Sequence, residues 1–212
     1  MMCAIEAARR GRQVLVLEQA GSPGRKIRIS GGGRCNFTNL HTRKEHFVAK
    51  NSHFAISALS RYRPEDFIAW VEVEGIAYHE KKLGQLFCDD SAQQIVSMLT
   101  EACMQAGVVI ETNATVRSVE RQAENFVVQT DKESYSGQAV VVACGGPSIP
   151  KMGSSRLGYK IAEHFALPLV EPEAALVPLT FEGALGKSMA ELSGVACEAL
   201  VRCGDTSFRE AI

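Results

Sequence analysis

An α/β fold with a parallel sheet is predicted for this chain by three observations. Val14–Leu17 is an unbroken run of aliphatic residues, the pattern of a strand buried on both faces. A short helical pattern of apolar residues precedes it and ends near Gly11. A second apolar run, Ala139–Ala143, has the same character and predicts another central strand. This order is typical of a Rossmann-like dinucleotide-binding domain.

The chain between the two apolar runs is expected to alternate between helices and short strands. Gly21–Asn39 is rich in Gly, Ser, Arg and Asn without periodicity, which predicts a long structured loop. Helices are expected at Ser52–Arg61, at Pro64–Glu74, at Ala92–Gln105 after a cap in Asp89-Asp90-Ser91, and at Leu157–Phe165. Strands are expected at Val108–Glu111, Thr115–Glu120 and Phe126–Thr130.

A domain boundary is predicted near Ala174, where the sequence pattern changes. Pro168, Pro172 and Pro178 interrupt the regular pattern, and the strands beyond them alternate more weakly. Residues 1–173 are therefore expected to form the Rossmann-like domain, and residues 174–212 the beginning of a β-rich domain.

Composition indicates a globular protein without membrane or metal partners. Hydrophobic residues make up 46% and charged residues 22% of the 212, and the net charge of -1 gives no overall attraction for nucleic acid. No apolar run is long enough to span a bilayer, and the start does not have the order of a signal peptide. Seven scattered cysteines without a C-x-x-C pair predict reduced thiols in the cytoplasm, and the spacing of His41, His46 and His53 fits no zinc site.

The opening of the chain matches the later part of a dinucleotide-binding unit. A helix, Gly11, a strand and the acidic Glu18 follow one another in the order that such a unit requires. Glu18, at the end of the strand, is expected to accept hydrogen bonds from ribose hydroxyls. The first strand and the glycine turn would fall before Met1, so we expect the unit to be incomplete at this end.

The stretch GRKIRISGGGRCNFTN, Gly24–Asn39, combines three consecutive glycines with four cations. Glycine allows positive φ and a close approach of the backbone to a ligand. Backbone N–H groups together with cationic side chains suit a pyrophosphate or an electron-rich ring. The residues of this loop that we expect to handle such a ligand are the cations Arg25, Lys26, Arg28 and Arg34 and the glycines Gly31, Gly32 and Gly33.

The same stretch closely resembles the YhiN type of flavoprotein, a family also called BaiN/RdsA-like, whose members are labelled NAD(P)/FAD-dependent or aminoacetone-oxidase-like. The resemblance continues through His79–Leu99, Ala143–Phe165 and Leu176–Phe181, and so covers essentially the whole chain. It implies a Rossmann-like FAD/NAD(P)-binding domain that lacks its first strand and glycine turn and carries the start of an inserted β-rich domain. It also implies an N-terminal fragment that binds FAD weakly or not at all.

The resemblance assigns FAD contacts to particular residues. Glu18 would hold the adenosine ribose, Arg25 and Lys26 the pyrophosphate, and Ser30–Asn36 the ribityl chain and flavin. The backbone of Val116 would meet the adenine. The segment Ala143, Cys144, Gly145 and Gly146 would cross the cofactor near its adenosine end, with Cys144 where Thr is usual.

The implied activity is reduction of an activated carbon–carbon double bond with NAD(P)H as electron donor. The substrate would be a uracil of ribosomal RNA, giving dihydrouridine, or a small enone. Alternatives are an FAD-dependent oxidase of aminoacetone-like amines and, for this chain itself, an inactive remnant. No catalytic residue is assigned: Cys35 has no second cysteine nearby in the sequence, so tight packing is expected for it in place of a redox role.

Overall fold

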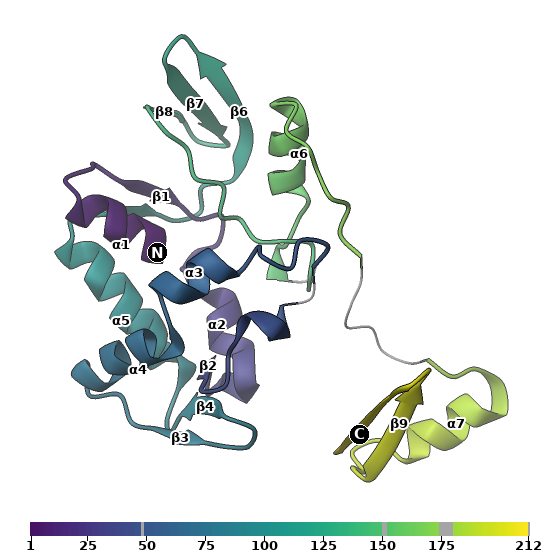
Figure 1. Ribbon diagram of the computed structural model, residues 1–212. Helices are drawn as coiled ribbons and strands as arrows, with labels where there is room; N and C mark the ends of the chain where they lie inside the picture. Colours follow the sequence, from purple (N-terminus) through teal and green to yellow (C-terminus); the bar gives the residue numbers. More distant parts are fainter. Residues whose placement is uncertain (48, 150–151, 174–179, 212) are drawn as a thin grey trace. The chain divides into compact units, whose positions relative to one another are not determined.

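The computed structural model describes residues 1–47, 49–149, 152–173 and 180–211, which divide into two compact units, Met1–Leu169 and Val170–Ile212. Figure 1 shows the course of the chain through both. The predicted boundary at Ala174 lies outside the described residues. No helix within the described ranges combines the length and apolar character that crossing a bilayer requires.

Unit 1 contains most of the regular structure. Its helices and 3-10 turns are α1 (Met2–Arg9), α2 (Arg25–Ile29), η1 (Ser30–Gly33), η2 (Lys44–His46), α3 (Ile56–Arg61), α4 (Pro64–Val73), α5 (Ala92–Gln105) and α6 (Leu157–His164). Its strands are β1 (Leu15–Leu17), β2 (Asn36–Asn39), β3 (Tyr78–Glu80), β4 (Gln85–Cys88), β5 (Val109–Glu111), β6 (Val116–Gln122), β7 (Asn125–Thr130) and β8 (Ser134–Gly137).

The α/β fold is confirmed by a parallel pair of strands, β1 and β5. Leu15 lies opposite Val109, and Leu17 lies opposite Glu111, so the carboxyl ends of both strands lie at the same edge. The prediction that the first strand is buried on both faces is wrong, since Leu15 is 38% exposed. Among the described residues β1 has a hydrogen-bonded neighbour on one side only, which leaves its other edge and part of its surface uncovered.

Helix α5 forms the centre of the hydrophobic core. It begins where predicted: the Ser91 hydroxyl accepts a hydrogen bond from the Gln93 N–H at 3.1 Å, which satisfies one of the free donors of the first turn. Side chains at helical spacing on this helix belong to one cluster of buried residues together with side chains of α1 and α4. This core includes Ile5, Val71, Ile95, Leu99 and Cys103.

The single tryptophan, Trp70, lies on α4 and packs against this core. Its ring centroid is 6.0 Å from that of Phe67 in an edge-on arrangement, and its indole N–H donates to the Glu74 carboxylate at 3.2 Å. Both aromatic residues fall at the helical spacing that predicts a core position, and both are half-buried.

The prediction of a long loop at Gly21–Asn39 is wrong beyond Gly24. This part of the chain contains α2, η1 and β2, and β2 joins the antiparallel sheet in the order β2-β4-β3. The periodicity is missing from the sequence because each element is only four or five residues long. Their stability comes from packing on α5 and pairing with β4, which are distant in the sequence.

The prediction of a central strand at Ala139–Ala143 is also wrong. The third strand of the antiparallel meander is β8, which pairs with β7 through Val128 opposite Tyr135. The apolar run that follows has no strand assignment, and Val141 is 67% exposed. A strand needs a hydrogen-bonding neighbour, and within the described residues none is paired with this run.

Helix α6 follows this run and packs against the meander. The His164 imidazole lies 2.9 Å from the Glu120 carboxylate, and the Phe165 ring lies 5.8 Å from that of Phe126. Unit 2 consists, in its described part, of α7 (Gly183–Glu191) and an antiparallel hairpin of β9 (Glu198–Cys203) and β10 (Thr206–Ala211).

Candidate functional site

The carboxyl ends of β1 and β5 form one edge of the candidate site. Backbone hydrogen bonds continue the pairing beyond the strands: the Ala114 N–H donates to the Glu18 carbonyl at 3.0 Å, and the Asn113 N–H donates to the Ala20 carbonyl at 3.0 Å. The Glu18 carboxylate accepts the Ala20 N–H at 2.8 Å, which fixes its position. In open α/β sheets, ligands bind at this end of the strands.

Val116 begins β6 two residues after Ala114, so the structure brings it near Glu18 although 98 positions separate them in the sequence. The two residues that the resemblance assigns to adenosine therefore lie at the same edge. Neither residue is fully buried.

Helix α2 is fixed against α5 by a close approach at Gly24. The φ of Gly24 is +76°, and a Cβ added there would lie 2.7 Å from Cγ2 of Val96. Arg28 strengthens the attachment, because its guanidinium donates to the Gln93 side chain, the Ser22 hydroxyl and the Pro23 carbonyl. Arg28 thus has a structural role, and its expected part in handling a ligand stays a prediction.

Arg25 and Lys26, on the same helix, are directed toward the loop that follows Gly146. The Lys26 ammonium donates to the Ser148 hydroxyl at 3.1 Å, and Arg25 Nη1 lies 3.9 Å from where a Cβ on Gly153 would stand. The Gln19 side chain, at the end of β1, donates to the Gly153 carbonyl. Three distant segments, the end of β1, the start of α2 and the loop after Gly146, thus converge around two cations.

Gly145 lies beside Lys26. Its φ is +75°, and a Cβ added there would lie 3.9 Å from the Lys26 ammonium. Glycine therefore keeps the backbone accessible next to a positive charge, an arrangement that suits a phosphate oxygen. Neither Ser148 nor Gln19 was expected from the sequence. For Ser148 the local signal is weak, a serine shortly after a glycine pair. The sequence around Gln19 gives no such signal.

The three consecutive glycines have different surroundings. All three have positive φ, but a Cβ on Gly31 would lie 2.6 Å from the Phe87 ring, whereas nothing lies within 4 Å of a Cβ on Gly32. Gly31 therefore allows packing against β4, and Gly32 presents an open backbone. Ser30 donates its hydroxyl to the Ile27 carbonyl at 2.8 Å, which joins the turn to α2.

The segment from Gly33 to Asn36 completes this loop. Gly33, like Gly32, has open space around its Cβ position, with the Arg28 carbonyl 3.9 Å away. The Arg34 carbonyl accepts the Cys88 N–H at 2.9 Å, and Asn36 lies opposite Phe87 in the β2–β4 pair. Ser30–Asn36 follows directly on α2, the helix that carries both cations.

Cys35 is buried with a φ of +54°, and the structure brings a second cysteine beside it. Cys88 follows Phe87 on the neighbouring strand and is fully buried. Burial raises the pKa of the Cys35 thiol, and burial together with the nearby Cys35 raises the pKa of Cys88 to about 11. Both thiols are protonated at neutral pH, which favours packing over nucleophilic chemistry. Sequence spacing gives no sign of this pairing.

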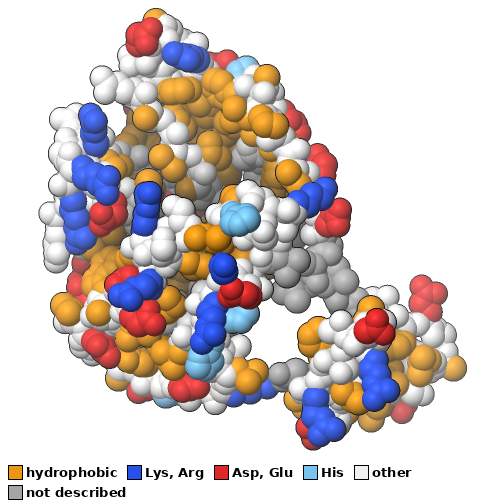
Figure 2. All heavy atoms as spheres, in the orientation of Figure 1, with side chains coloured by type: hydrophobic (Ala, Val, Ile, Leu, Met, Phe, Trp, Pro, Cys, Tyr) orange, Lys and Arg blue, Asp and Glu red, His pale blue; other side chains and the backbone are white. Residues whose placement is uncertain are grey.

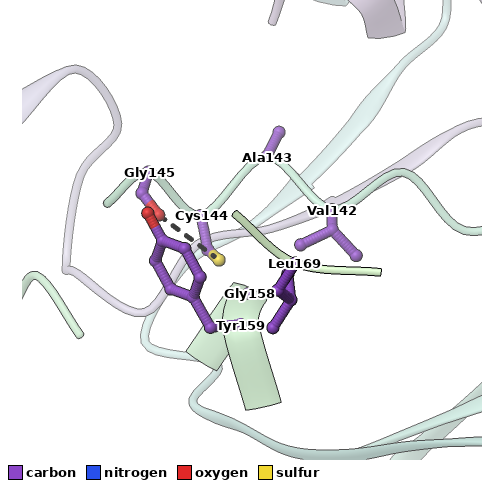
Figure 3. A pocket seen from close by; sticks show the side chains of 7 residues that line it. All are labelled: Val142, Ala143, Cys144, Gly145, Gly158, Tyr159 and Leu169. Carbon is purple, nitrogen blue, oxygen red and sulfur yellow. Dashed lines mark hydrogen bonds between the residues drawn. The ribbon is translucent and has the colours of Figure 1, made fainter. Parts of the chain in front are cut away.

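Ala143, Cys144 and Gly145 line an open hollow of about 490 Å³ (Figure 3). Gly158 lets α6 approach this segment, since a Cβ there would lie 3.2 Å from the Cys144 sulfur. Gly146 adjoins the hollow, with the Tyr159 hydroxyl 3.8 Å from its Cβ position. The lining is mainly apolar and suits a ring better than a phosphate. The lining residues are Val142, Ala143, Cys144, Gly145, Gly158, Tyr159 and Leu169.

The three histidines of residues 41–53 make local contacts. His46 Nδ1 accepts the Arg43 N–H at 3.2 Å, and His53 Nδ1 lies 3.5 Å from the Ser52 hydroxyl. Within the part of the chain that the structure describes, no group of three His, Cys, Asp or Glu side chains is arranged to hold a metal ion.

Comparison with known proteins gives a family and several relatives. The family model described as HI0933-like protein Rossmann domain matches residues 1–204. Two relatives, from Escherichia coli (strain K12) and Haemophilus influenzae (strain ATCC 51907 / DSM 11121 / KW20 / Rd), are both named ribosomal RNA dihydrouridine synthase. The Escherichia coli relative is 44% identical over 99% of the chain, and the Haemophilus influenzae relative is 40% identical over 100% of the chain.

A third relative is the 3-dehydro-bile acid delta(4,6)-reductase of Clostridium scindens (strain ATCC 35704 / DSM 5676 / VPI 13733 / 19), 28% identical over 84% of the chain and 44% of its own length. The chain covers 53% and 54% of the two dihydrouridine synthases. It therefore spans about half the length of the curated relatives it matches.

Proposed function

The chain belongs to the HI0933-like Rossmann family, and from this premise we propose that it is the dinucleotide-binding part of an FAD-dependent oxidoreductase. The observation that carries the proposal is the convergence of Glu18, Arg25, Lys26 and Gly145 at the carboxyl edge of β1 and β5. A carboxylate for ribose hydroxyls and two cations for a pyrophosphate are the groups that a dinucleotide requires at this edge.

The residues fit FAD from the adenosine end to the flavin end. The Glu18 carboxylate would accept hydrogen bonds from the ribose, with the Val116 backbone beside the adenine. Arg25 and Lys26 would neutralise the pyrophosphate, and the bare backbone of Gly145 would let it approach Lys26. Gly32 and Gly33, which have open space at their Cβ positions, would meet the ribityl chain and the flavin ring. Gly31 lets the turn pack against Phe87. Ser30, Arg34, Cys35 and Asn36 would support this turn.

When bound, FAD would supply a site for hydride transfer at its flavin ring. The chain's own residues would bind and orient it. The buried, protonated Cys35 and Cys88 would exclude water behind the glycine turn without taking part in electron transfer. The described residues give no group that is placed as a catalytic acid or base.

We infer that the whole protein reduces an activated carbon–carbon double bond with NAD(P)H as electron donor. The relatives' names, a dihydrouridine synthase and a reductase, favour reduction over amine oxidation. At 44% identity, a uracil of ribosomal RNA is favoured over a small enone as substrate. Such a substrate would place the protein in the cytoplasm. We assign residues 1–173 to the FAD-binding domain and residues 174–212 to a β-rich domain.

The test is an absorption spectrum of the purified chain after incubation with FAD and desalting. Retained flavin absorbance that Glu18→Gln and Lys26→Gln lower would support the site, and flavin retained equally by all three proteins would contradict it. NADPH-dependent bleaching of the flavin without oxygen would support the reductase. Hydrogen peroxide formed with aminoacetone would instead favour the amine oxidase.

A further inference from the structure

A basic and aromatic surface lies on the chain after β2. We call it the basic–aromatic surface, and it consists of Arg43, Lys44, Phe47, Lys50, Phe54 and Lys81, all exposed. Figure 2 shows Lys, Arg and His side chains close together on the face where Figure 1 draws η2 and α3. None of these residues takes part in the site proposed for FAD.

Two aromatic rings on this surface face solvent. Phe54 is 78% exposed and Phe47 is 47% exposed. The aromatic rings of the core, such as Phe67 and Trp70, contact one another, but within the described residues neither Phe47 nor Phe54 contacts another ring. An exposed ring adds little to folding, and it offers a flat face for stacking.

The charge of this stretch differs from that of the whole chain. Between His41 and Phe54 three cations stand against one carboxylate, a formal charge of +2, whereas the whole chain has -1. That carboxylate, Glu45, lies 3.9 Å from the Lys44 ammonium with both side chains more than half exposed, so it screens the cation only weakly. A polyanion would therefore find a local positive potential here.

The surface is attached to the glycine turn through β2 and β4. Beyond Asn39 the Leu40 N–H donates to the Gly84 carbonyl at 2.9 Å, and the Asn39 side chain donates to the Leu83 carbonyl at 2.9 Å. The Lys81 ammonium lies 5.5 Å from the centre of the Phe87 ring, the same ring that packs against Gly31. A ligand that contacts Lys81 would thus lie close to the turn assigned to the flavin.

We propose that the basic–aromatic surface binds single-stranded RNA, with Phe47 and Phe54 stacking on unpaired bases and the cations neutralising phosphates. The choice of RNA rests on the proposed function; the exposed rings and the local charge carry the location. Stacking requires bases that are free of a duplex, so a loop or an unpaired strand is the expected form. The surface would present such a strand beside the flavin turn.

The stacking of aromatic rings on bases is tested by fluorescence anisotropy, with a fluorescein-labelled 12-nucleotide oligouridine and the full chain. Phe54→Ala is expected to weaken binding about tenfold, the size of effect expected for the loss of one base-stacking contact. Phe208→Ala is the matched control, because Phe208 is 59% exposed in unit 2 and should leave the affinity unchanged. Equal affinity for Phe54→Ala and the wild-type chain would overturn the role of stacking, as would equal binding of an RNA duplex.

The contacts between the cations and the phosphates are tested by the salt dependence of the same affinity. Replacing Arg43, Lys44 and Lys50 together by Gln should reduce the slope of log K against log salt by about 2, at roughly 0.7 for each phosphate contact. Arg9, Arg10 and Arg12, changed together to Gln, are the control cluster. The same loss of slope in both triple variants would overturn the location of the surface.

Measuring FAD absorbance on the same samples separates this inference from the proposed function. A chain that retains FAD but binds no oligouridine overturns the RNA surface and leaves the cofactor site intact. A chain that binds oligouridine through Phe54 supports the surface whether or not it retains FAD.

Discussion

The two sides of the candidate site are held in different ways. On one side, α2 is fixed by a backbone approach to a buried helix: Gly24 meets Val96, which is 1% exposed, and Arg28 makes three hydrogen bonds. On the other side, residues 139–149 are mostly exposed, and Ser148 and Gly153 meet the first side through the side chains of Lys26 and Gln19. The first side should govern folding and the second ligand binding, because packing contributes more to stability than exposed polar contacts do.

The largest effect is expected at Gly24. Gly24→Ala should lower the free energy of unfolding by roughly 2–4 kcal/mol, through a strained positive φ and the contact with Val96. Gly11→Ala is the control, since Gly11 has nearly the same φ but nothing within 4 Å, and only the strain of about 1 kcal/mol applies. Urea unfolding of both variants measures the difference, and equal losses would show that α2 does not depend on this contact.

An alkaline loss of stability of roughly 3 kcal/mol is expected from Cys88, given about 1.4 kcal/mol for each unit of pKa. Because burial raises its pKa to about 11, the unfolded chain releases this proton near pH 9 while the folded chain keeps it. Stability should therefore fall as the pH rises from about 9 to 11.

Cys88→Ala should flatten this part of the pH profile, and Cys144→Ala, on the exposed side of the site, should leave it unchanged. Urea unfolding at pH 8, 9.5 and 11 makes the comparison. A profile unaffected by Cys88→Ala would contradict the assignment of the loss to this thiol.

Lys26→Gln should weaken FAD binding about tenfold, as expected for the loss of one charge-assisted contact of roughly 1.5 kcal/mol. Its stability should change by less than about 0.5 kcal/mol, because its one hydrogen bond is exposed. Lys160→Gln, an exposed lysine on α6, is the control. Titration of FAD against both variants is the measurement, and a large loss of stability in Lys26→Gln would place Lys26 in the folding core instead.

The smallest effect is expected where α6 meets the meander. His164→Gln should change the free energy of unfolding by less than about 0.5 kcal/mol, because an exposed polar contact contributes little. Phe126→Ala, which removes the ring contact with Phe165, should have the larger effect of the two. The reverse order in urea unfolding would mean that the polar contact holds α6.

Local patterns predicted the elements that local forces determine. Ser91 and the apolar spacing from Ala92 to Gln105 place α5 at its observed bounds, and the run at Val14–Leu17 contains β1. The equally apolar run at Ala139–Ala143 is unpaired in the described chain, because hydrophobicity indicates a need for burial without naming a partner.

The residues of the candidate site divide in the same way, into those that a local motif predicts and those that depend on distant contacts. Glu18 and the glycine turn were predicted from motifs, and the structure brings Glu18 near Val116 and Lys26 near Gly145. Three residues of the site were not predicted: Gln19, Ser148 and Cys88, which lies beside Cys35. Each depends on contact between segments far apart in the sequence. Roles in FAD binding remain predictions for all of these residues.

The position of Trp70 has a practical consequence for these measurements. As the only tryptophan in the chain, it emits from the α4 side of unit 1, where unfolding would move its ring from Phe67 into water. Its emission spectrum therefore reports loss of that core and receives no tryptophan signal from unit 2. A flavin bound within range would quench the same emission, so a single fluorescence titration could follow both cofactor uptake and the integrity of the domain that holds it.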